Sequence, residues 1–139
     1  INRGLLTQQA FYDAKNSTKT YSGKIYHKVK KMIELRKSTP ALSRGDFTIL
    51  KTNYPHVFAY IRSYKGEKYL IVNNLSNKRL NAEVDLPANM LIKAFKNNEH
   101  SVYLTNILTD EQYKLKPSIK DKKTRLLMYP YAEVWLKLP

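Results

Sequence analysis

The spacing of apolar residues changes at Pro40, and this change constrains the fold more than any other feature of the chain. Upstream, Ile25, Val29 and Ile33 recur at the spacing of one helix face, with lysines between them, which is the pattern of an amphipathic helix. Pro40 cannot continue that helix, because its ring disfavours the helical conformation at Thr39 and it carries no N–H. Downstream of the proline, apolar residues alternate with polar ones, which is the pattern of β-strands.

The helical part of the chain is expected to have two pieces. The longer helix should begin near Ser22, a residue type that caps helix N-termini, and a shorter one should occupy residues 7–14 with Thr7 as its cap. The apolar stripe of the longer helix needs a cover. We expect either that residues 1–20 fold back over it or that copies of the chain associate through it. We favour the homo-oligomer, because the N-terminal segment is itself rich in apolar residues.

Short apolar runs follow the helix at fairly regular spacing. They lie at residues 47–50, 57–61, 69–72, 80–86, 102–106, 113–115, 126–128 and 132–138. Turn-forming residues separate them, with Gly66 between the second and third runs. Residues 116–123 indicate a charged loop, and residues 90–95 either a short strand or a turn of helix. The pattern predicts a mainly β fold: an antiparallel Greek-key β-sandwich of about seven or eight strands, preceded by one amphipathic α-helix and an N-terminal loop or short helix.

Composition excludes several kinds of site. The 139 residues contain no cysteine, so disulfides and thiolate ligands are excluded, and no apolar run is long enough to span a membrane. The formal net charge is +14, from 25 basic and 11 acidic residues. Because the basic residues are scattered and no nucleic-acid motif accompanies them, we interpret this charge as a solvated, lysine-rich surface. A basic nucleic-acid-binding β domain is therefore the least favoured of the three functions that we consider for this chain.

No group of residues in the sequence predicts catalytic or metal chemistry. Asp110 and Glu111 are adjacent, but they stand in a turn-like stretch, where Asp commonly caps the backbone. The three histidines, His27, His56 and His100, lack the short spacings that zinc sites use. Glycine-rich phosphate loops are also lacking. We therefore expect no catalytic residue, no metal ligand and no cofactor site in this chain.

Three segments resemble the α-amylase family of glycoside hydrolases, in the order in which that family carries them. Residues 26–47 resemble the junction between the last barrel helix and the C-terminal domain, with the letters LRK…PAL…GDF. Residues 57–76 resemble a hairpin of that domain and read VFAYIR…YLIVNNLS. Residues 129–135 resemble its final strand and read YPYAEVW. The resemblance thus extends from the long helix to the end of the chain.

The resemblance implies a division of the chain into two parts. Residues 1–42 would be the end of a catalytic (β/α)8 barrel, a loop and its last helix, and residues 43–139 a C-terminal all-β sandwich. A whole barrel needs about 200–250 residues. We therefore expect this chain, which starts at Ile1, to be a piece of a longer enzyme whose catalytic carboxylates lie upstream. The sandwich would be non-catalytic and would stabilise the barrel, its partner, in carbohydrate metabolism.

A carbohydrate-binding module is the alternative function. Sugars stack on exposed aromatic faces, and Trp135 and Tyr129 are the aromatic candidates for binding an α-glucan. Arg3 is a third candidate, because the Asn-Arg-Gly sequence around it resembles a segment that follows the last barrel strand in the family. The remaining strand tyrosines are expected to pack in or over the sheets. They are Tyr60, Tyr69, Tyr103 and Tyr131.

Overall fold

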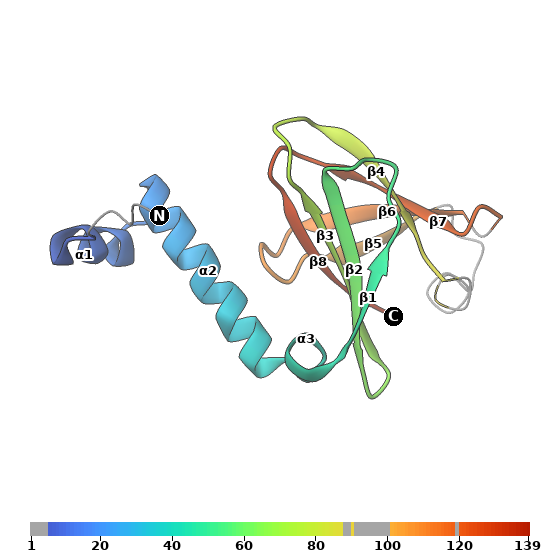
Figure 1. The fold of residues 1–139 in the computed structure, drawn as a ribbon, viewed down its shortest axis with the longest axis horizontal. Helices are drawn as coiled ribbons and strands as arrows, with labels where there is room; N and C mark the ends of the chain where they lie inside the picture. Colours follow the sequence, from blue (N-terminus) through green and yellow to red (C-terminus); the bar gives the residue numbers. More distant parts are fainter. Residues whose placement is uncertain (1–5, 88–89, 91–100, 119) are drawn as a thin grey trace. The chain divides into compact units, whose positions relative to one another are not determined.

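The computed structural model describes residues 6–87, 90, 101–118 and 120–139. It divides into two compact units, residues 1–39 and residues 40–139. The first unit is helical and the second is built almost entirely of strands (Figure 1). Apart from Met90, the segment 90–95, for which the sequence left strand and helix open, lies outside the described residues.

The first unit consists of helices α1, Gln8–Asn16, and α2, Tyr21–Ser38. The predicted cap of α1 is confirmed, since the Thr7 hydroxyl accepts a hydrogen bond from the N–H of Ala10 at 3.1 Å. Of the two forms that the sequence left open for the N-terminal piece, a loop or a short helix, the structure has the short helix.

The predicted cap of α2 is wrong by two residues. Thr20, whose backbone is extended, accepts a hydrogen bond from the N–H of Gly23 at 3.1 Å, and Ser22 already lies inside the first turn. Gly23 shows why the helix begins here. A Cβ at this position would lie 1.8 Å from the carbonyl oxygen of Ser17. Only glycine lets the loop between α1 and α2 approach the helix so closely.

Helix α1 packs on α2 but covers only part of its apolar stripe. The Phe11 ring meets the Tyr26 ring edge-on, with 5.9 Å between the ring centroids. Ile25, Val29 and Ile33 remain exposed in this chain. Folding back of the N-terminal segment, the alternative that we did not favour, thus occurs and still leaves apolar surface uncovered.

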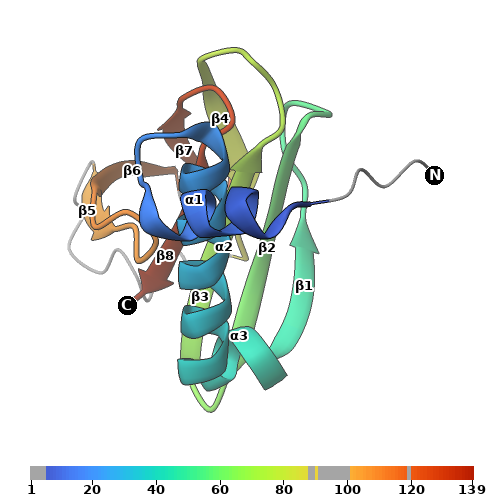
Figure 2. The same ribbon diagram turned by 90° about the vertical axis from the view of Figure 1, so that its left-hand side faces the viewer.

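Helix α2 ends at Ser38, as Pro40 predicts, but the proline also starts a new element. Helix α3, Pro40–Arg44, packs against the first sheet of the sandwich (Figure 2). Its residue Ala41 is fully buried, and the carbonyl oxygen of Ala41 accepts a hydrogen bond from Nε of Arg62 at 3.2 Å. This short helix therefore belongs to the sandwich and not to α2.

The second unit is an antiparallel β-sandwich of two four-stranded sheets, which confirms the predicted fold class. The first sheet has the order β1-β2-β3-β8, with strands β1 Asp46–Leu50, β2 Val57–Tyr64, β3 Glu67–Asn74 and β8 Glu133–Leu138. The second has the order β4-β7-β6-β5, with strands β4 Leu80–Asp85, β5 Val102–Thr105, β6 Gln112–Ser118 and β7 Lys123–Met128. The prediction of a charged loop from residue 116 is wrong in its first part, because Lys116 to Ser118 continue β6 and pair with β7.

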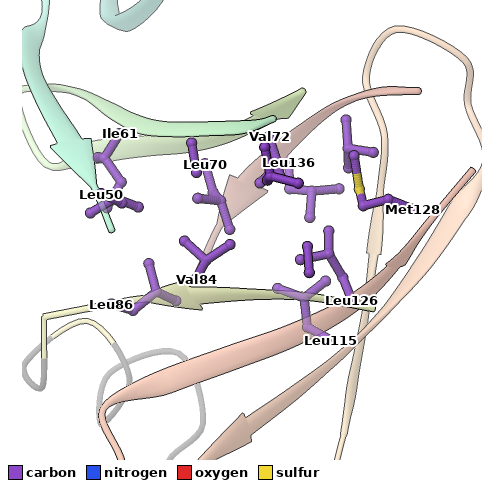
Figure 3. Close-up of a cluster of buried hydrophobic side chains, with 14 of the residues drawn as sticks. Leu50, Ile61, Leu70, Val72, Val84, Leu86, Leu115, Leu126, Met128 and Leu136 are labelled. Atoms are coloured by element: carbon purple, nitrogen blue, oxygen red, sulfur yellow. The ribbon is translucent and has the colours of Figure 1, made fainter. Parts of the chain in front are cut away.

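The core lies between the two sheets (Figure 3). Strand β4 contributes to it as its sequence predicts: Leu80, Ala82 and Val84 are buried, and the residues between them point away. The first and second sheets both supply fully buried aliphatic side chains to this layer. The most central are Ile61, Leu70, Val72, Leu136, Val84, Leu115, Leu126 and Met128.

The β2–β3 hairpin has the tightest connection in the sandwich. Its two turn residues, Lys65 and Gly66, both have positive φ, 47° and 89°, which is the geometry of a two-residue type I′ turn. The twist of this turn matches that of the paired strands. It holds β2 and β3 in register over their whole length, from Tyr64 opposite Glu67 to Val57 opposite Asn74.

The two sheets are joined at both sides of the sandwich. Thr52, just beyond β1, forms a β-bridge with Val84 of β4, and Asn106, just beyond β5, forms one with Leu136 of β8. Asn106 is fully buried. Its amide donates to the Glu133 carbonyl at 2.9 Å, and its side-chain oxygen accepts from the N–H groups of Trp135 and Leu108 at 3.0 and 3.2 Å. One side chain thus fixes the chain beyond β5 to β8.

Glu83 links two strands on the outer face of the second sheet. Its carboxylate accepts hydrogen bonds from Nε of Arg125 at 2.7 Å and from Nζ of Lys123 at 3.2 Å. The bond from Arg125, and after it the bond from Lys123, holds the pKa of Glu83 below its ordinary value of 4.5. The same bond raises the pKa of Arg125. Both effects indicate an ion cluster that forms only when β4 and β7 pair.

We predict that Asn106→Ala lowers the free energy of unfolding by about 2–4 kcal/mol, because it leaves buried N–H groups without an acceptor. Urea denaturation followed by circular dichroism measures this change. Asn81→Ala is the matched control: Asn81 is exposed, so its loss should stay within about 0.5 kcal/mol. Equal effects of the two substitutions would contradict the role of Asn106.

We predict a pH-dependent effect of Glu83→Gln. The folded pKa of Glu83 lies below the unfolded pKa, so the carboxylate stabilises the fold above the unfolded pKa, and this stability is lost as the pH falls through the folded pKa. The urea midpoint should therefore fall in the variant at pH 7, and the difference should shrink below pH 4.5 and disappear when both states are protonated.

The control for this prediction is Asp85→Asn. Asp85 is also on β4 and forms no ion pair within the described part of the chain, so its substitution should change the midpoint less at pH 7. A Glu83→Gln deficit that persisted unchanged in strong acid would show that the lost interaction is not ionic.

Candidate functional site

The outer face of the first sheet carries an apolar row where a solvated sheet usually carries polar residues. In the strand register Ile49 lies opposite Tyr60, Tyr60 opposite Ile71, and Ile71 opposite Trp135. These residues alternate with the core residues of the same strands, so they point away from the core. Because directly opposed side chains are neighbours, the row crosses all four strands of the sheet.

Two phenylalanines extend this row on strands β1 and β2. The Tyr60 ring lies 4.8 Å from the ring of Phe47 and 5.3 Å from that of Phe58, measured between centroids. We call the set the apolar outer face. It consists of Phe47, Ile49, Phe58, Tyr60, Ile71 and Trp135. The exposed fraction varies across this face, from 1% for Ile71 to 64% for Ile49. The half of the face on β1 and β2 is therefore open to solvent.

A row with two cationic side chains borders the apolar outer face. Phe47 lies opposite Arg62, Arg62 opposite Tyr69, and Tyr69 opposite Lys137. The Arg62 guanidinium lies 5.9 Å from the Phe47 ring centroid. Nζ of Lys137 donates to a Glu67 carboxylate oxygen at 2.7 Å, which raises the pKa of Lys137. Ion pairs and aromatic contacts thus hold this border in place.

The two candidate residues from the sequence that lie within the described ranges, Trp135 and Tyr129, do not come together. Trp135 is half-buried at the β8 end of the apolar outer face. Tyr129 follows β7, is 53% exposed, and has the Arg79 guanidinium 5.2 Å from its ring centroid. Arg3 lies outside the described residues. Trp135 and Tyr129 therefore belong to two surfaces, one on each sheet.

The expectation that the other tyrosines pack in or over the sheets holds for two of the four. Tyr69 is buried and Tyr60 is half-buried. Tyr103 and Tyr131, however, are 60% and 62% exposed. Tyr103 points outward from the edge strand β5, and Tyr131 sits in the turn before β8 with a φ of 53°. Edge and turn positions leave these rings without a neighbouring strand to cover them.

The apolar outer face escaped the sequence analysis, although a signal for it exists. Phe47 and Ile49 alternate with Thr48 and Leu50, and Leu50 alone among them is buried. An edge strand with apolar residues on both faces needs cover on both. The alternation in residues 47–50 could therefore have indicated a second contact surface.

Within the described ranges, the acidic residues and histidines that the sequence analysis considered lie on separate parts of the structure or in a turn. Among them, no three side chains of His, Asp or Glu lie close enough to hold a metal ion. Asp110 has a φ of 62°, and Glu111 accepts a hydrogen bond from the hydroxyl of Thr109 at 3.1 Å. This pair thus forms part of a turn, as predicted. No helix within the described ranges has the length and apolar character to cross a membrane.

The sequence matches known carbohydrate-active enzymes. Residues 47–108 match the protein family described as maltogenic amylase, C-terminal domain. The chain is 38% identical over 52 residues to the oligo-1,6-glucosidase of Bacillus cereus, which covers 37% of this chain and 9% of that enzyme. It is 23% identical over 115 residues to the oligo-1,6-glucosidase of Parageobacillus thermoglucosidasius, which covers 83% of this chain and 18% of the relative. The chain thus spans less than a fifth of these relatives' lengths.

Solved structures share the fold over most of the chain. A noncanonic maltogenic α-amylase from Thermotoga neapolitana superposes with a TM-score of 0.63 at 14% identity, covering 88% of this chain and 26% of that one. Isomaltulose synthase from Klebsiella sp. LX3 superposes with a TM-score of 0.58 at 25% identity, covering 94% and 19%. These matches confirm the resemblance found in the sequence. The chain is thus similar to the C-terminal portion of α-amylase-family enzymes, and residues 47–108 match the C-terminal domain of that portion.

Proposed function

We propose that this β-sandwich covers and stabilises the catalytic (β/α)8 barrel of a longer α-amylase-family chain. The apolar outer face carries the proposal, because half of it is open to solvent in this chain. Contiguous exposed apolar patches mark surfaces that contact another protein surface. A barrel wall of the same parent chain is a partner that would keep this face permanently buried.

The division of the chain into residues 1–42 and 43–139 is part of the same proposal. Residues 1–42 would close the barrel, with α2 as its last helix. The exposed side chains of Ile25, Val29 and Ile33 support this assignment, because one helix face that α1 leaves uncovered matches what a barrel helix buries against its neighbours. A side chain of this size contributes about 1.5–3 kcal/mol when fully buried.

The parent chain, and not this domain, would carry the catalytic activity. Glycoside hydrolysis uses two carboxylates on either side of the scissile bond, and we assign no catalytic residue to this chain. Relatives such as the oligo-1,6-glucosidases support a parent that acts on α-glucosides or α-glucans. In this assignment the sandwich stabilises the enzyme, and the reaction takes place in the barrel.

We predict that Ile49→Asp destabilises the longer parent enzyme more than it destabilises the isolated chain. Ile49 is 64% exposed here, so the substitution should cost under about 1 kcal/mol in the isolated chain. In the parent it should cost about 1.5–3 kcal/mol more, because a buried apolar contact is replaced by a charge. Thermal denaturation of both proteins measures the two values.

Thr105→Asp is the control for Ile49→Asp. Thr105 is exposed on the edge strand of the second sheet, away from the apolar outer face, so its substitution should have the same small effect in the parent and in the isolated chain. An Ile49→Asp effect that is equal in both proteins would overturn the proposed docking.

We further predict that the isolated chain associates through α2, because the barrel that would cover its stripe is missing. Light scattering should show a mass that rises with protein concentration. Val29→Asp with Ile33→Asp should abolish this rise, since a charge in the contact opposes burial. Lys28→Asp lowers the net charge by the same two units at a position of α2 that does not line the hollow formed by Ile25, Val29 and Ile33, so this substitution should leave the rise. If the chain stays monomeric at every concentration, the proposal that a barrel normally covers the apolar stripe of α2 is contradicted.

A further inference from the structure

The two cations in the row that borders the apolar outer face differ in how their charge is neutralised. Arg62 of β2 and Lys137 of β8 both lie opposite Tyr69 of β3, one on each side of it. Nζ of Lys137 lies 2.7 Å from a carboxylate oxygen of Glu67, so this cation has its partner within the chain. Arg62, by contrast, forms no ion pair with any residue that the structure describes.

Two contacts hold the Arg62 side chain in place without neutralising it. Its Nε donates a hydrogen bond to the carbonyl oxygen of Ala41 at 3.2 Å, and Ala41 is itself fully buried in α3. The guanidinium also lies 5.9 Å from the Phe47 ring centroid. A guanidinium has five N–H donors, and the bond to Ala41 uses one. The terminal amino groups of Arg62 therefore remain available to a partner beyond the described chain.

These amino groups lie on the side of the sheet that carries the apolar outer face. Arg62 follows the core residue Ile61 in β2, so its side chain points outward together with those of Phe58 and Tyr60. Its guanidinium is next to Phe47, which belongs to that face. A protein surface that covers Phe47 therefore also removes water from Arg62. Because a guanidinium stays charged at every physiological pH, it needs an acceptor, and preferably an anion, when water is removed.

We propose that the barrel wall presents a carboxylate, from Asp or Glu, to the terminal amino groups of Arg62. This inference rests on the proposed docking of the barrel against the apolar outer face. Apolar contacts are non-directional, whereas an arginine and a carboxylate pair through two parallel N–H···O bonds of defined geometry. The Arg62 pair thus fixes the orientation of the sandwich on the barrel. Lys137 needs no such partner, because Glu67 already neutralises it.

Arg62→Ala tests this pairing by thermal denaturation of the parent enzyme and of the isolated chain. In the isolated chain the substitution removes only the contacts with Ala41 and Phe47. In the parent it also leaves the barrel carboxylate buried without a partner. The midpoint should therefore fall by about 3 °C or more beyond the fall seen in the isolated chain.

Lys137→Ala is the matched control. It removes a cation from the same row, but the partner of this cation lies within the chain. The shift of the midpoint should therefore be the same in the parent and in the isolated chain.

A cross-linking experiment on the Arg62→Lys parent identifies the carboxylate directly. A water-soluble carbodiimide condenses a carboxylate with an amine in contact with it, forming an amide while the reagent takes up the water. Mass spectrometry of the digested protein should find position 62 joined to an Asp or Glu of the barrel. The amide between Lys137 and Glu67, whose charged atoms are 2.7 Å apart, serves as the internal positive control.

The results separate this proposal from the docking on which it rests. If Ile49→Asp destabilises the parent more than the isolated chain but Arg62→Ala affects both equally, the barrel docks without a carboxylate at Arg62 and the pairing is wrong. A cross-link between Lys137 and Glu67 with none from position 62 to the barrel also contradicts the pairing. If Ile49→Asp affects both proteins equally, the docking itself is wrong, and the pairing with it.

Discussion

Residues 40–139 depend on the packing of aliphatic side chains between two sheets. Every strand of both sheets except β5 places at least one buried apolar side chain in this layer, and β5 adds partly buried Val102 and Leu104. The layer contains few polar side chains, so its backbone groups must pair within the sheets. Where the chain leaves a strand, the side chains of buried asparagines form hydrogen bonds with the backbone groups that the sheets leave unpaired. Asn74, at the end of β3, bonds the carbonyl groups of Lys78 and Tyr129, and Asn106 bonds the backbone of Glu133 and Trp135 in β8.

The packing of this layer also determines what the outer faces can do. Period-two alternation sends every second residue of a strand outward, and the two sheets use those positions differently. The first sheet places aromatic and aliphatic residues there, with Ile71 already buried by its neighbours. The second places charged and amide residues there, together with Leu127 and Tyr103. One sandwich thus presents a mainly apolar outer face on its first sheet and a mainly polar outer face on its second.

Sequence patterns predicted the elements of this fold and missed most of its surfaces. Alternation identified β4 and β8, and the apolar runs at residues 57–61 and 69–72 identified β2 and β3, because burial on one or two faces determines the residue types of a strand. The cap of α2 was misplaced because Thr20 and Ser22 are both good capping residues, and only the approach of the loop to Gly23 decides between them. Lys116 was assigned to a loop because exposed strand positions on a solvated face resemble loop residues. Tyr103 was expected to be covered because the sequence does not tell which strand lies at an edge.

The bridges from Thr52 to Val84 and from Asn106 to Leu136 have a consequence for the behaviour of the domain outside its parent. Edge strands with unpaired backbone groups recruit further strands and nucleate aggregates. Here a β-bridge joins each edge of one sheet to an edge of the other sheet. The four edge strands, β1, β4, β5 and β8, are only four to six residues long. Self-association of the sandwich is thereby directed to side-chain contacts, which are reversible and have a defined geometry. A domain of this construction can be cut, duplicated or attached to a different enzyme with little risk of strand-by-strand polymerisation.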